Sequence, residues 1–96
     1  MLTKSTISKL NLIEGEFSTG DAKDVLTNVF SSKIKYHELK NFSSQVQNGK
    51  NDDFAKERIL FLTNELNKIN EIIAEARFLD KKIKISSEIK ISLCDD

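Results

Sequence analysis

The longest regular pattern of apolar residues in the chain lies between Asp52 and Leu79. Its members recur at alternating steps of four and three residues, which places them on one stripe of an α-helix. Asp52 and Asp53 precede the stripe and Lys81 and Lys82 follow it. Acidic residues at the start of a helix and basic residues at its end interact favourably with the helix dipole. We therefore predict one helix of roughly 40 Å over residues 52–79. Its stripe is Ala55, Ile59, Leu62, Leu66, Ile69, Ile73 and Ala76.

A second kind of pattern, strict alternation of apolar and polar residues, follows this helix. Apolar residues and one serine occupy every second position from Ile83 to Leu93, and lysine, serine and glutamate occupy the positions between them. This alternation is typical of a β-strand with one buried face and one solvated face. An antiparallel sheet accommodates such a strand best.

The segment Thr6–Phe17 is predicted as the first strand. Its alternation is imperfect, because a regular strand would put Leu10 and Leu12 on one face and Ile13 on the other. Gly15 suggests a bulge or a close backbone approach. We expect this strand to be covered on one side and partly covered on the other.

Ser18 has the character of a helix N-cap, with Asp21 three residues later in the capping-box position. The short helix expected from there ends near Ser32. It would carry Ala22, Val25, Leu26, Val29 and Phe30 on one face.

Residues 33–50 are ambiguous. Ile34 and Tyr36 favour a second strand over 33–42, whereas Leu39, Phe42 and Val46 have helical spacing. We predict the strand, with a helix as the alternative, and a polar loop over 43–51. The expected fold is a single α+β domain over residues 1–96 with the order β-α-β-α-β. In it one long and one short helix cover one face of a small, mostly antiparallel sheet.

Apolar residues outside the stripe suggest a partner for the long helix. A three-stranded sheet would cover only the stripe, which leaves Phe54, Leu60, Phe61, Ile72 and Leu79 as a candidate self-association surface. Free sheet edges point the same way. We expect a homo-oligomer, with a dimer favoured, and we expect docking to another protein as the alternative use of the same surface.

Composition disfavours some other partners. The chain has 15 basic and 15 acidic residues, so it lacks the cationic excess that drives binding to nucleic acid. Lys81, Lys82, Lys84 and Lys90 are the one basic concentration, and we interpret them as a solvated sheet face. The N-terminal residues do not open an apolar run, and Cys94 is the only cysteine. A cytoplasmic protein without a membrane span is the expectation.

Candidate chemistry is sparse. The segment from Gly15 to Gly20 has the glycine spacing of a phosphate-binding loop, but Asp21 and Ala22 stand where that motif needs lysine and serine or threonine. One cysteine and one histidine do not make a metal site, and we expect no cofactor.

His37 is the one residue whose ordinary pKa lies near neutrality. Together with Tyr36 and Arg58 it forms a candidate ligand site, although a structural histidine is the simpler interpretation. The first hypothesis is therefore a small non-enzymatic interaction or assembly module that self-associates through its long helix and sheet edges. The alternatives are an oligomeric ligand-binding protein or enzyme with a site at the subunit boundary near His37, and a weak nucleic-acid-binding module.

Overall fold

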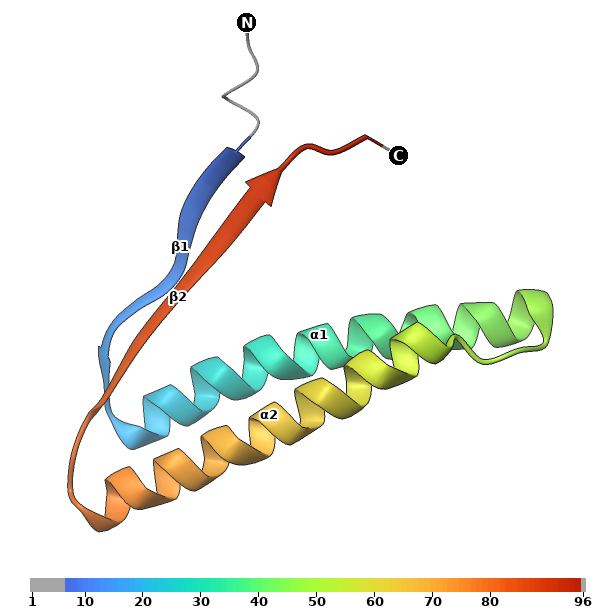
Figure 1. Cartoon of the computed structure of the whole chain (residues 1–96). Coiled ribbons are helices and arrows are strands. Elements are labelled where there is room, and N and C mark those ends of the chain that lie inside the picture. Colours follow the sequence, from blue (N-terminus) through green and yellow to red (C-terminus); the bar gives the residue numbers. More distant parts are fainter. Residues whose placement is uncertain (1–6, 96) are drawn as a thin grey trace, which may run out of the picture.

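The computed structural model describes residues 7–95 of the chain, so Thr6, where the first strand was expected to begin, lies outside them. Four elements follow one another: β1 (Ile7–Phe17), α1 (Thr19–Asn48), α2 (Asp53–Phe78) and β2 (Ile83–Ser92). The two strands pair antiparallel, and the two helices form an antiparallel hairpin between them in the sequence (Figure 1). The fold is mixed α+β, as predicted.

The predicted element order is wrong in the middle of the chain. Residues 33–42 are not a strand and residues 43–48 are not a loop, because α1 continues without interruption to Asn48. The first helix is therefore long rather than short, and the order is β-α-α-β. The physical reason is a tertiary contact, since this part of α1 lies along α2 and buries one side against it (Figure 1). Such packing overrides the strand preference of Ile34 and Tyr36.

Both helices are capped by local residues. The Ser18 side chain accepts a hydrogen bond from the backbone N–H of Asp21 at 3.1 Å, which confirms the predicted N-cap. Asp52 caps α2 in the same way, accepting from the backbone N–H of Ala55 at 3.0 Å. Gly49 caps the C-terminal end of α1, with a φ of 69° that glycine adopts without strain.

The predicted stripe of α2 is the seam of the helical hairpin. All seven of its residues are buried or half-buried, and Leu62, Ile73 and Ala76 are among the most buried residues of the chain. Helix α1 contributes an apolar half near the strands and a polar half near the connection between the helices. Its seam residues are Ala22, Leu26, Phe30, Ile34, His37, Asn41 and Ser44.

Side chains fix both ends of the hairpin. At the connection, Asn41 Oδ1 accepts a hydrogen bond from the backbone N–H of Asp52 at 2.6 Å. At the opposite end, Arg77 Nε donates to Thr19 Oγ1 at 3.4 Å. We call the end with the connection the tip and the end with the strands the base.

The two strands form a ribbon in which a bulge restores the apolar face. Leu10 pairs with Ile89 and Ile13 pairs with Ser87, so Leu12 is an extra residue without a partner in the ladder. This bulge puts Leu10 and Ile13 on the same face as the isoleucines of β2. The expectation that they occupy opposite faces is therefore wrong. Gly15 is not the bulge, although its φ of 147° explains why glycine is found there.

The ribbon and the hairpin meet only near the base and diverge from there (Figure 1). The helices therefore do not cover one face of the sheet, contrary to the expected two-layer arrangement. The chain extends 49 × 44 × 15 Å and its radius of gyration is 17.4 Å. A compact chain of this length would have a radius of gyration of about 12.5 Å.

Candidate association surface

Helix α2 carries a second stripe beside the seam. Each of its first seven members comes immediately before a seam residue, so the stripe lies about 100° around the helix from the seam. We call it the outer stripe of α2, and it consists of Phe54, Arg58, Phe61, Glu65, Lys68, Ile72, Glu75 and Leu79. Its apolar members are well exposed, with 69% of Phe54 and 57% of Ile72 accessible to solvent. The stripe spans the whole helix without a covering layer.

Two contacts within this stripe join neighbouring residues. The Arg58 guanidinium lies over the Phe61 ring, 4.9 Å from its centroid, where the cation is attracted to the face of the ring. Lys68 Nζ lies 3.8 Å from a carboxylate oxygen of Glu65. That pair is solvent-exposed and therefore contributes little to stability.

Helix α1 has a matching stripe on the same face of the hairpin. Val25, Val29 and Tyr36 also come immediately before seam residues. Because the two helices are antiparallel and share one seam, both outer stripes turn toward the same side. The outer stripe of α1 consists of Val25, Val29, Ser32, Tyr36, Leu39, Ser43 and Val46, and Lys33 and Lys40 lie between this stripe and the seam. The two outer stripes together are the association face.

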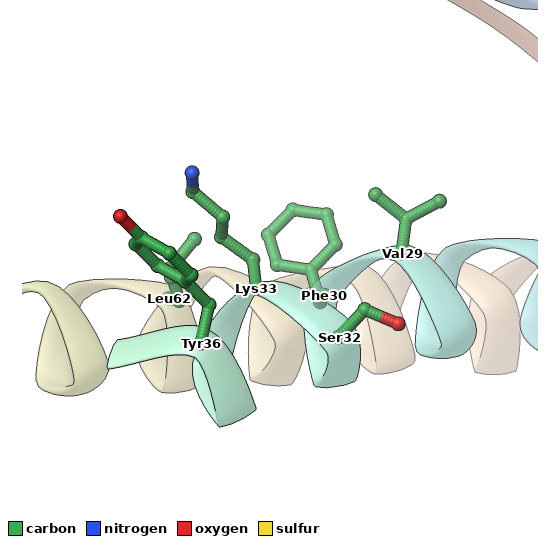
Figure 2. Close-up of a pocket in the computed structure, with 6 residues that line it drawn as sticks. All are labelled: Val29, Phe30, Ser32, Lys33, Tyr36 and Leu62. Carbon is green, nitrogen blue, oxygen red and sulfur yellow. The ribbon is translucent and has the colours of Figure 1, made fainter. Parts of the chain in front are cut away.

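A hollow of about 380 Å³ lies on this side of the hairpin. In Figure 2, Val29, Phe30, Lys33 and Tyr36 rise from α1 in the same direction, and Leu62 of α2 lies behind them. The Lys33 ammonium lies 5.0 Å from the centroid of the Tyr36 ring. The hollow is almost entirely apolar, so an apolar side chain would fill it better than a polar ligand.

The ribbon has an uncovered apolar face of its own. Near the base Ile85 is buried, but Leu10, Ile89 and Ile91 are exposed farther along the ribbon. A two-stranded ribbon is marginally stable alone and gains stability when a further layer covers it. Each of its two strands also has one edge without a neighbouring strand in the described part of the chain.

Four of the five residues predicted from the sequence as a self-association surface lie on the outer stripe of α2: Phe54, Phe61, Ile72 and Leu79. Leu60 does not, because it lies on the other side of the helix, where it is 63% exposed. The outer stripe of α1 was missed. Val25 and Val29 were predicted on one face together with Ala22, Leu26 and Phe30, which lie in the seam. Leu39 and Val46 showed helical spacing, but the strand and loop predictions for residues 33–51 concealed the stripe.

The candidate ligand residues His37, Tyr36 and Arg58 lie close together but face different environments. His37 is in the seam with 6% of its surface exposed, whereas Tyr36 and Arg58 belong to the two outer stripes. The rings of Tyr36 and His37 make an edge-to-face contact with centroids 5.2 Å apart. A solute could reach the tyrosine hydroxyl and the guanidinium but not the imidazole.

The environment of His37 disfavours the protonated form of its imidazole. Burial lowers the pKa of His37, and the nearby cations Lys33, Arg58 and Lys40 lower it further, while Asp52 opposes them. Its Nε2 has no hydrogen-bond partner among the described residues. This environment is that of a seam residue.

The lysines of β2 do not form a basic surface. Lys84 pairs across the ribbon with Glu16, and Lys90 pairs with Lys9. The polar face of the ribbon also includes Glu14 and Glu88, so acidic and basic residues balance.

The remaining candidates occupy ordinary positions. The segment 15–20 is the end of β1 and the capped start of α1, which confirms the interpretation as a helix start. Cys94 is exposed. Over residues 7–95, no three His, Cys, Asp or Glu side chains lie close enough to hold a metal ion together.

Neither long helix of the described chain has an apolar run sufficient to cross a membrane. Comparisons with protein-family models, with curated proteins and with solved structures found no match for this chain.

Proposed function

We propose that this chain is a small non-enzymatic assembly module that self-associates through α2 and the edges of its ribbon. The observation that carries the proposal is the association face, on which exposed apolar residues recur along the whole helical hairpin and no other described part of the chain covers them. Fully burying one large aliphatic or aromatic side chain stabilises a protein by roughly 1.5–3 kcal/mol, so several uncovered ones leave a large gain unrealised. A partner with a complementary apolar face would recover it.

The extent of the surface supports the same proposal. The chain exposes 7695 Å² for a mass of 10.9 kDa, whereas a compact monomer of that mass exposes about 5,600 Å². A stable protein–protein interface takes about 800 Å² from each partner. The excess surface is therefore large enough for at least one such interface.

The charge distribution favours another copy of the chain over nucleic acid. Acidic and basic residues balance over the whole chain and again on the polar face of the ribbon. A self-complementary surface is also the commonest basis of small soluble oligomers. No described group of residues has the arrangement of nucleophile, base and orienting partner that an enzyme needs.

The experiment is multi-angle light scattering over a dilution series of the full chain. We expect a mass of at least twice the chain mass of 10.9 kDa at high concentration, falling toward the monomer on dilution. A monomer at every concentration up to the millimolar range would contradict the proposal.

A further inference from the structure

The outer stripe of α2 is complementary to itself when it is read backwards. In chain order its eight residues are apolar, basic, apolar, acidic, basic, apolar, acidic and apolar. The steps between them alternate four and three in both directions. Two such stripes can therefore meet antiparallel with every residue opposite another member of the stripe.

In that alignment every opposed pair is favourable. Phe54 meets Leu79 and Phe61 meets Ile72, so apolar residues lie against apolar residues. Arg58 meets Glu75, and Glu65 meets Lys68. A parallel alignment would instead put each charge against the same charge of the other copy, which is unfavourable.

We propose that two copies of this chain pair α2 against α2, antiparallel, about a two-fold axis that passes beside Leu66 and Asn67. The inference rests on the proposed self-association and specifies its surface and geometry. Helix α2 then has two neighbours, α1 of its own chain along the seam and α2 of the second copy along the outer stripe. Helices with two adjacent heptad stripes of this kind are those of helical bundles.

The charged pairs act between copies. Arg58 and Glu75 are 17 residues apart on one straight helix, a separation of roughly 25 Å, so they cannot meet within a chain. Glu65 and Lys68 already lie side by side in one copy, next to the proposed axis. Two copies would bring four alternating charges together there.

The charged pairs select the orientation while the apolar pairs supply most of the affinity. Exposed ion pairs contribute little stability each. The parallel alignment, however, replaces attraction between opposite charges by repulsion between like charges, so the charged residues discriminate strongly between the antiparallel and the parallel dimer.

The test is a reciprocal charge reversal. In Arg58→Glu, two carboxylates face each other at both symmetric contacts, and in Glu75→Arg two guanidinium groups do so. Each variant alone should dimerise roughly tenfold more weakly than the parent chain. An equimolar mixture of the two variants should dimerise as tightly as the parent. In the mixed dimer each of the two contacts again joins one acidic and one basic side chain.

Controls with the same charge changes lie on other sides of α2. Lys56→Glu and Glu71→Arg alter exposed residues outside both stripes and should leave dimerisation unchanged. Circular dichroism verifies that every variant retains its helices. Because Arg58 also stacks on Phe61, agreement between the Arg58 and Glu75 variants separates the charge contact from the loss of that stacking.

The outcomes separate this inference from the function on which it depends. A parent chain that is monomeric overturns both. A parent chain that dimerises, with variants and controls that dimerise equally well, overturns the antiparallel α2 pairing and leaves self-association through another surface, such as the ribbon. Weak dimers of each variant alone, with recovery in the mixture, are the result expected from the proposed geometry.

Discussion

At the scale of single residues, His37 is unusual because it is a titratable side chain buried in the seam between the two helices. It occupies a seam position that leucine or isoleucine would fill in an ideal helical hairpin. Burial and three nearby cations lower its pKa, so protonation is less favourable in the folded chain than in the unfolded chain.

The sign of the pH dependence follows from this shift. The pKa of His37 in the folded state lies below its ordinary value of about 6.5. The unfolded state therefore binds the proton first as the pH falls, and the folded state loses stability from about pH 6.5 downward until the folded pKa is passed. We expect the urea concentration at the unfolding midpoint to decrease as the pH is lowered from about 7.5 to about 5.5.

His37→Leu is the matched control for this titration. The chain has no other histidine, so the variant should show a flat midpoint over the same range. A parent chain whose midpoint is already flat, or rises on acidification, would show that the imidazole is not buried as described.

Three leucine and isoleucine positions of α2 separate folding from association. Leu62 lies in the seam, Ile72 on the outer stripe and Leu60 on neither. At concentrations below association, Leu62→Ala should lower the free energy of unfolding by roughly 2–4 kcal/mol. Ile72→Ala should lower it by under about 1 kcal/mol and weaken dimerisation instead.

Leu60→Ala is the control for both effects. It removes a similar side chain from the same helix and should change neither quantity appreciably. Loss of dimerisation in the Leu60 variant would move the association surface to the other side of α2.

At the scale of elements, α2 could be predicted from its sequence and the second half of α1 could not. The seven seam residues of α2 and its capping aspartate specify a helix locally. From His37 onward, the seam positions of α1 are polar, and its exposed apolar residues are on another side. The apolar residues of this segment that have helical spacing, Leu39, Phe42 and Val46, are exposed and do not form the seam. The segment becomes a helix because α2 lies beside it and because Asn41 binds the start of α2.

A prediction at the scale of elements concerns the bulge in the ribbon. Leu12 is unpaired in the ladder and half-exposed, whereas Ile85 is buried on the apolar face. Leu12→Ser should therefore change the melting temperature little. Ile85→Ser should lower it by several degrees, because it places a hydroxyl in an apolar contact.

The ribbon prediction is measured by thermal denaturation monitored by circular dichroism, under identical concentrations for both variants. Equal destabilisation by the two substitutions would mean that Leu12 lies on the covered face and that the bulge is elsewhere.

At the scale of the whole molecule, the chain is too extended to bury its apolar residues by itself. Its radius of gyration of 17.4 Å and its two diverging arms leave the association face and much of the ribbon uncovered. A protein of this kind should be stabilised by whatever covers those faces, and its stability should depend on concentration.

This dependence is the prediction for the whole molecule. If the partner is a second copy, each tenfold increase in protein concentration should raise the melting temperature by roughly 2–4 °C. The Arg58→Glu variant, which weakens the dimer, should show a smaller increase over the same range. A melting temperature independent of concentration for the parent chain would contradict self-association.

The candidate site could be predicted from the sequence to about the same extent as the fold. Phe54, Phe61, Ile72 and Leu79 could be recognised as surplus apolar residues because α2 itself was correctly predicted. Leu60 could not be separated from them, since the sequence does not show which side of a helix meets a partner. The outer stripe of α1 could be recognised only once residues 33–48 were known to be helical.

The sequence by itself determined the features that depend on neighbouring residues alone. These are the capped helix over 52–79, the alternating strand after it, the position of the first strand and the start of the first helix at Ser18. Only the tertiary structure decided the length of α1, the face of Leu10 and Ile13, and the separation of the ribbon from the hairpin. These three depend on contacts between residues far apart in the chain. Packing against α2 makes residues 33–48 helical although Ile34 and Tyr36 prefer a strand. Pairing with β2 determines that Leu12 is the bulge residue of β1.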